Sequence, residues 1–140
     1  MKDAILIKNA RMVNEGSITE GDLLIRDGRI SKIAAGIPAD ATTDVLDANG
    51  AWLLPGMIDD QVHFREPGLT YKAGIWSESR AAAAGGITSF MEMPNTNPAT
   101  VTLEALEDKY AIGAEKSLVN YSFYLGATND NLDVIRALQP

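Results

Sequence analysis

The 140-residue chain contains no cysteine and a single histidine. Without cysteine it can form neither a disulfide nor a thiolate metal site, which fits a reducing compartment, so we expect a cytoplasmic protein. Cationic residues are also scarce, because 12 Lys and Arg stand against 19 Asp and Glu and give a net charge of −7. No basic stripe is available for nucleic acid or an acidic membrane surface, and neither partner is expected.

Long apolar runs are missing as well. The amino terminus, Met1-Lys2-Asp3, lacks the extended apolar region of a signal peptide. No apolar run approaches the roughly 20 residues that span a bilayer. With 46% hydrophobic and 22% charged residues, the composition is that of an ordinary globular protein.

Residues 1–52 predict a small β-rich domain. Short apolar runs flank the dipeptides Asp27-Gly28 and Asn49-Gly50. Both dipeptides are typical of type I′ hairpin turns, which need the positive φ that Gly, Asn and Asp tolerate. We therefore expect two hairpins, one joining residues 23–26 to 29–33 and the other joining 45–47 to 51–53.

Residues 53–140 change to an alternation of strands and helices, the signature of βαβ units. An apolar strand ends at Ile58, and further strands are expected over 87–93 and 118–125. Helices are expected over 75–84, before Gly85-Gly86, over 103–116, with Thr102 as N-cap, and after a capping Asn131. The second helix carries an apolar face of Leu103, Leu106, Tyr110, Ala111 and Ala114.

This pattern predicts an α/β fold in which an incomplete (β/α)8 TIM-type barrel, comprising the first three βα units, follows the β-rich domain. A complete barrel takes about 250 residues. Three parallel strands leave unpaired edges, so we expect either the front portion of a longer protein or a small protein completed by self-association. A homo-oligomer is expected.

One run of residues, 56–68, combines strand and chemistry and reads GMIDDQVHFREPG. Ligand-type and charged side chains follow an apolar strand, as at the carboxyl ends of barrel strands. Residues two apart on a strand point to the same side, so Gln61 and His63 are placed to share a metal ion. An amide oxygen is a weaker zinc donor than an imidazole. A lone histidine is also compatible with a purely structural polar role.

The run resembles the metal-binding signature of the dihydroorotase branch of the amidohydrolase superfamily, Asp-x-His-x-His-Phe-Arg-Glu-Pro-Gly, with Gln61 in place of the first histidine. A second segment, from Met93 to Thr96, resembles the Met-Pro-Asn-Thr segment of that family. The resemblance implies one or two zinc ions held by His63 and Gln61, with further ligands from beyond residue 140. It implies that Asp59 orients a ligand, and that Arg65 and Asn95 hold a substrate carboxylate.

Each role has a structural alternative. Asp59 is also compatible with a strand end, and Asn95 with a proline-bounded turn. Arg65 is also compatible with an ion pair to its neighbour Glu66.

The implied reaction is the reversible interconversion of N-carbamoyl-L-aspartate and dihydroorotate in pyrimidine biosynthesis. The remaining metal ligands and the catalytic aspartate come from later strands in the resembling family, so no catalytic residue is assigned here. The 140 residues alone are expected to be inactive. Gln61 motivates an alternative, a non-catalytic assembly or regulatory subunit. Another alternative, a hydantoinase- or allantoinase-like hydrolase, is disfavoured by Arg65, because rings without a carboxylate do not need it.

Overall fold

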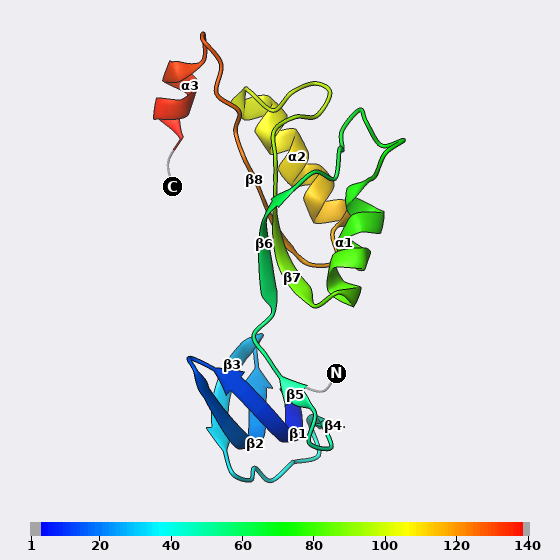
Figure 1. Cartoon of the computed structure of the whole chain (residues 1–140), viewed down its shortest axis with the longest axis vertical. Coiled ribbons are helices and arrows are strands. Elements are labelled where there is room, and N and C mark those ends of the chain that lie inside the picture. Colours follow the sequence, from blue (N-terminus) through cyan, green and yellow to red (C-terminus); the bar gives the residue numbers. More distant parts are fainter. Residues whose placement is uncertain (1–3, 139–140) are drawn as a thin grey trace. The chain divides into compact units, whose positions relative to one another are not determined.

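The computed structural model describes residues 4–138 and divides the chain into two compact units, Met1–Pro55 and Gly56–Pro140 (Figure 1). The boundary predicted from the sequence lies three residues earlier, between residues 52 and 53. Each unit has its own sheet and its own hydrophobic cluster. Within the described residues, no helix is long and apolar enough to cross a membrane.

The first unit is a five-stranded sheet. Its strands are β1 (Ala4–Asn14), β2 (Ser17–Arg26), β3 (Arg29–Ala34), β4 (Thr43–Asp47) and β5 (Trp52–Leu53). The central strand β1 runs antiparallel to β2, and it pairs in parallel with β4 along its first half and with β5 further on.

One of the two predicted hairpins is confirmed. Asp27 and Gly28 have φ values of 51° and 69°, as a type I′ turn requires, and join β2 to β3. The second hairpin is wrong. Asn49 and Gly50 do have positive φ, but β4 and β5 both pair with β1 rather than with each other. The turn joins β4 to β5, and these two strands pair with successive parts of the same strand, β1. Local sequence does not encode this choice of partner.

A buried carboxylate, Asp22, holds the first unit together. Its side chain accepts hydrogen bonds from the backbone N–H of Asn9, at 2.9 Å, and of Ile37, at 2.8 Å. Asn9 lies in a bulge of β1 with φ of 53°, and Ile37 lies beyond β3. The two amides, with Asn9 the stronger, hold the pKa of Asp22 below its usual value. The carboxylate therefore ties the bulge to the segment after β3.

The Asp22→Asn variant should destabilise the first unit, because an amide turns an N–H₂ group toward one of the two backbone donors. Because the folded-state pKa is lowered, the stabilisation is present above the ordinary Asp value of 3.8 and is lost as pH falls through the lowered pKa. We expect a lower urea midpoint for the variant at neutral pH and a shrinking difference in acid. Trp52 fluorescence in a Trp76→Phe background measures it. Glu15→Gln, in an exposed turn, is the charge-matched control, and a pH-independent difference would contradict the prediction.

The second unit alternates strands and helices as predicted, although its first strand continues to Val62 instead of ending at Ile58. Its elements are β6 (Met57–Val62), α1 (Ile75–Ala84), β7 (Ile87–Glu92), α2 (Leu103–Lys116), β8 (Asn120–Phe123) and α3 (Leu132–Ala137). The sheet order is β6-β7-β8, with both pairs of strands parallel. The bounds of α1 and α2 agree with the sequence prediction, and the Thr102 side chain caps α2 by accepting from the Ala105 N–H.

Helices α1 and α2 pack against one another and against the same face of this sheet (Figure 1). The core between them is built on five buried apolar side chains, Val62, Phe64, Ile75, Phe90 and Phe123. Three of these are aromatic, and the Phe90 ring contacts both others, with centroids 4.5 Å from Phe64 and 6.3 Å from Phe123. The core therefore lies directly beneath the carboxyl ends of β6 and β7.

The predicted apolar face of α2 is mostly wrong. Only Leu106 of that face is half-buried, and the other four residues are exposed, namely Leu103, Tyr110, Ala111 and Ala114. The buried residues of the helix are Lys109 and Gly113. A Cβ at Gly113 would lie 2.7 Å from the Tyr121 ring, so the glycine permits a close approach of helix to strand. A lysine on the buried face is not visible as part of an apolar pattern.

Asn131 does not cap α3 with its side chain. Its amide instead accepts from the Thr128 N–H and donates to the carbonyls of Val101 and Gly126. These three bonds link two loops. Helix α3 still begins directly after Asn131, whose backbone carbonyl accepts from the Ile135 N–H, so the predicted helix start is right and only the side-chain cap is wrong.

Candidate functional site

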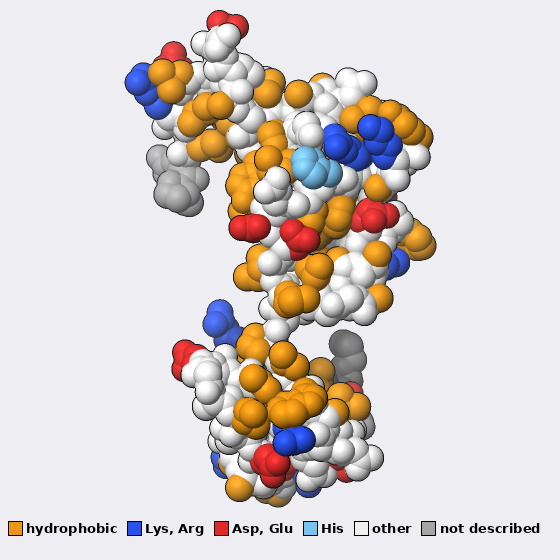
Figure 2. All heavy atoms as spheres, in the orientation of Figure 1, with side chains coloured by type: hydrophobic (Ala, Val, Ile, Leu, Met, Phe, Trp, Pro, Cys, Tyr) orange, Lys and Arg blue, Asp and Glu red, His pale blue; other side chains and the backbone are white. Residues whose placement is uncertain are grey.

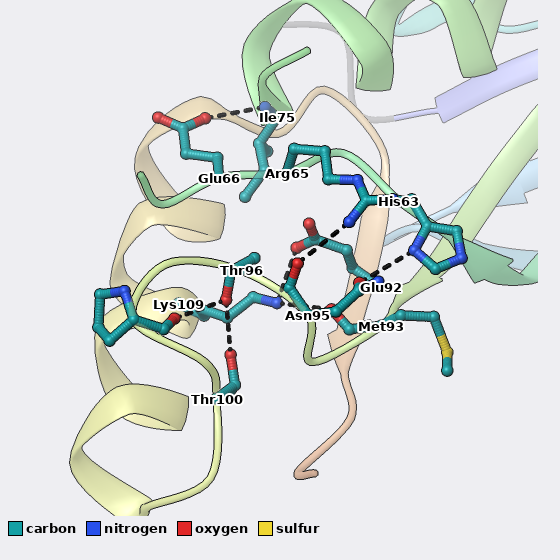
Figure 3. Close-up of polar contacts among 11 residues, drawn as sticks. His63, Arg65, Glu66, Ile75, Glu92, Met93, Asn95, Thr96, Thr100 and Lys109 are labelled. Carbon is teal, nitrogen blue, oxygen red and sulfur yellow. Dashed lines mark hydrogen bonds and ion pairs between the residues drawn. The ribbon is translucent and has the colours of Figure 1, made fainter. Parts of the chain in front are cut away.

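Three of the five predicted site residues meet at the carboxyl ends of β6 and β7. The Nδ1 atom of His63 lies 3.0 Å from the Oδ1 atom of Asn95, and the Arg65 guanidinium donates to the Asn95 carbonyl oxygen at 3.2 Å. Figure 3 shows the three side chains pointing toward one another from two loops. The single histidine of the chain is open on one face of the second unit, with cationic side chains near it (Figure 2).

The contact with Asn95 decides which nitrogen of His63 carries the proton. An amide oxygen only accepts, so Nδ1 donates and a neutral ring keeps its lone pair on Nε2. A hydrogen bond of this kind sets the tautomer and orientation of histidines that bind metal ions. With Nδ1 as the donor to Asn95, Nε2 is the nitrogen of a neutral ring that can accept.

The other two predicted site residues, Asp59 and Gln61, lie on β6 and bond to each other. The Asp59 carboxylate accepts from the backbone N–H of Gln61 at 3.1 Å. Gln61 and His63 are exposed, whereas Val62 and Phe64 are buried, so burial alternates along the strand end. The exposed side chains of Gln61 and His63, two residues apart, are consistent with their facing the same side of the strand.

The described residues do not by themselves make a zinc site. Across residues 4–138, no group of three or more His, Cys, Asp or Glu side chains is arranged to hold a metal ion. Zinc sites in proteins use at least three protein ligands. His63 offers one imidazole nitrogen, and the structure supports no chemical step that passes through a metal held by these residues alone.

Glu66 organises the loop after β6. Its buried carboxylate accepts from the backbone N–H of Ile75, at 2.9 Å, and forms an ion pair with Lys116 of α2. The alternative that Arg65 pairs with Glu66 is therefore wrong. The carboxylate lies at the amino terminus of α1, where a negative charge is stabilised and where Gly74 has no side chain to cap the helix. The same ion pair raises the pKa of Lys116.

The two loops touch at Gly68. The Asn97 N–H donates to the Pro67 carbonyl at 3.2 Å, and a Cβ at Gly68 would overlap the Asn97 carbonyl oxygen. Gly68 has a φ of 78°, and Arg65 also adopts the left-handed region with a φ of 67°. An L-residue with a side chain is rare in this region, so its occurrence at Arg65 indicates a conformation imposed by surrounding contacts.

An ion pair that the sequence analysis missed lies beneath the site. Glu92, the last residue of β7, and Lys109 of α2 are both fully buried, with the ammonium 3.0 Å from a carboxylate oxygen. Burial raises the pKa of Glu92, and the Lys109 ammonium opposes that rise. The sequence signal that could have revealed this ion pair is Lys109, which lies three residues from each of the apolar residues Leu106 and Ile112.

The Gly68→Ala variant should be more destabilised than Gly86→Ala. Both glycines have positive φ, 78° and 84°, but a Cβ at Gly86 meets nothing within 4 Å. We expect Gly86→Ala to cost about 1–2 kcal/mol for the left-handed backbone alone. Gly68→Ala should cost more because it also separates the two loops. Urea unfolding followed by Trp76 fluorescence in a Trp52→Phe background measures both, and equal losses would contradict the loop contact.

The tautomer of His63 can be tested directly, because it is the only histidine in the chain. Long-range ¹H–¹⁵N spectra of the neutral ring should show the proton on Nδ1. Asn95→Ala removes the acceptor, so the two tautomers should mix and the two ¹⁵N shifts should move toward each other. Asn95→Asp keeps an acceptor and is the matched control. A wild-type proton on Nε2 would refute the assignment.

Comparison with known proteins gives consistent results. The Dihydro-orotase-like family model matches residues 50–132. A dihydroorotase from Methanosarcina acetivorans is 40% identical over 134 residues, covering 96% of this chain and 28% of that protein. An allantoinase from Deinococcus radiodurans is 39% identical, covering 92% of this chain and 29% of that protein.

Solved structures show the same relationship. The L-hydantoinase from Arthrobacter aurescens superposes with a TM-score of 0.90 at 36% identity, over 97% of this chain and 30% of that one. The α/β fold is therefore that of the amino-terminal region of a hydantoinase, and the chain spans less than a third of the length of these relatives. From its sequence and its fold, the chain belongs to the dihydroorotase-like family.

Proposed function

We propose that this chain is the amino-terminal part of a dihydroorotase-type cyclic amidohydrolase, which interconverts N-carbamoyl-L-aspartate and dihydroorotate in pyrimidine biosynthesis. The observation that carries the proposal is the position of Arg65 beside His63 and Asn95. Both compounds carry a carboxylate, and a guanidinium can bind one through two parallel hydrogen bonds while remaining charged at any physiological pH.

The contacts of the site leave donors for that carboxylate. Arg65 uses one terminal nitrogen for the Asn95 carbonyl, and a guanidinium has five N–H groups in all. The Asn95 side chain accepts from His63 through its oxygen, so its N–H₂ group can donate to the substrate. Arg65 and Asn95 would then hold the carboxylate while Nε2 of His63 faces the reacting end of the ring.

The barrel belongs to the same proposal. We infer that β6, β7 and β8 are the first three strands of a (β/α)8 barrel, because they are parallel and adjacent in chain order. The side chains in question lie at the carboxyl ends of two of them, where such barrels carry their sites. The relatives are more than three times as long as the matched region, which provides for the remaining strands.

In this proposal, a zinc ion would need further ligands from beyond residue 140. The described residues offer a single imidazole, and Gln61 is a neutral donor that suits zinc less well. We accordingly assign His63 and Arg65 the roles of orienting and binding, and expect the 140 residues alone to show no turnover of dihydroorotate.

A hydantoinase-like activity is the second candidate, supported by the TM-score of 0.90 and the 36% identity to the L-hydantoinase structure. Hydantoin carries no carboxylate, so this candidate gives Arg65 no substrate to bind. The two candidates therefore differ in what the loss of Arg65 should do.

The decisive experiment uses the polypeptide expressed from the complete gene, with its length and metal content measured on the same sample. It should hydrolyse dihydroorotate, and Arg65→Gln should raise KM for dihydroorotate about tenfold to a hundredfold, the value of a charge-assisted hydrogen bond or two. Arg80→Gln is the control, since Arg80 stacks on Trp76 of α1.

Each other outcome favours a different function. Turnover of hydantoin or allantoin without dihydroorotate, unaffected by Arg65→Gln, would replace the proposal with the second candidate. A polypeptide that binds no metal and turns over none of the three compounds would favour the non-catalytic assembly subunit suggested by Gln61.

A further inference from the structure

The buried pair of Glu92 and Lys109 has no evident role in stability. Both side chains are fully buried, and a buried ion pair commonly contributes less than well-packed apolar side chains of the same volume. Among the described residues, neither Glu92 oxygen has a donor in good hydrogen-bond geometry. The Lys109 ammonium at 3.0 Å is therefore the principal partner of the carboxylate.

The pair contacts backbone groups next to the candidate site. Lys109 donates to the carbonyl oxygen of Met93 at 3.2 Å, two residues before Asn95 (Figure 3). Met93 in turn donates its N–H to the carbonyl of Val62, the residue before His63. The ammonium therefore contacts Met93, the residue whose own N–H joins the end of β7 to the end of β6.

The residue that carries the carboxylate is itself paired with the other strand. In the parallel register of β6 and β7, Glu92 is the partner of Val62, the residue before His63. Arg65 has a left-handed φ of 67°, a conformation that its surroundings must impose. The buried pair thus lies where the ends of β6 and β7 are joined, just before the segments whose side chains form the site.

We propose that Glu92 and Lys109 are positioning residues, which hold the segments 63–65 and 93–95 together and so maintain the hydrogen bond between His63 and Asn95. The catalytic consequence rests on the proposed function. The positioning itself does not, because it concerns contacts within this chain.

The test is a double variant, Glu92→Met with Lys109→Met, which removes both charges at nearly constant volume. We expect it to fold, because no buried charge is left unpaired, and to lose the preference of the His63 proton for Nδ1. The two imidazole ¹⁵N shifts should then move toward each other in spectra of the neutral ring. Shifts equal to those of the wild type in the folded variant would overturn the proposal.

Gly113→Ala is the matched control. It lies one turn from Lys109 on the same face of α2 and disturbs packing against Tyr121 without touching the ion pair. It should lower the urea midpoint and leave the His63 shifts unchanged. Equal changes of the His63 ¹⁵N shifts in the control and in the double variant would mean that any loss of packing has this effect. That result would overturn the positioning role of the pair.

A second variant keeps the test decisive if the double variant does not fold. Glu92→Gln has nearly the same shape and keeps an acceptor for Lys109 but lacks the negative charge. It should produce a smaller shift in the same direction, and an unchanged spectrum would again overturn the proposal. Because these spectra need no substrate, the positioning role can fail while the hydrolase function stands, and a polypeptide without dihydroorotate turnover would refute only the function.

Discussion

Parallel pairing between β6 and β7 is the constraint on which the site depends. Because the two strands are adjacent and run in the same direction, their carboxyl ends lie at one edge of the sheet. His63 and Asn95 are 32 residues apart in the sequence and still share a hydrogen bond. An antiparallel pairing would have placed them at opposite ends of the unit, whatever the quality of the individual motifs.

Buried carboxylates hold much of the remaining backbone in place, and each has a different kind of partner. Asp22 uses two backbone amides, Glu66 uses a helix amino terminus and a lysine, and Glu92 uses a buried ammonium. A carboxylate that loses its partner in the interior is costly. Each therefore restricts the backbone around it to arrangements that keep the partner in place.

The sequence predicted the elements whose signals are local. Helix α1 ends at Gly85-Gly86 and α2 begins after Thr102, and both signals act within one turn of the chain. The second hairpin failed for the opposite reason. Residues 49 and 50 do adopt the predicted turn, but the choice of β1 as partner for β4 and β5 depends on strands more than 30 residues away.

The residues of the site also divide into those with local signals and those whose contacts are distant in the sequence. His63, Arg65 and Asn95 were identified because they stand in short, recognisable motifs, and the structure brings them together. Neither the role of Glu66 nor that of Lys109 could be predicted, because the contacts of each join segments that are 9 to 50 residues apart. A charge within an apolar helical face is itself informative, since a buried lysine requires a partner that the fold must supply.

The amide of Gln61 does not determine the orientation of the His63 ring. Gln61 and His63 have different hydrogen-bond partners, since the backbone N–H of Gln61 bonds to Asp59 and the His63 ring bonds to Asn95. Replacing an imidazole at position 61 by an amide reduces the number of good zinc donors on β6. It does not remove the contact that directs Nε2 of the remaining histidine, because that contact comes from the neighbouring strand.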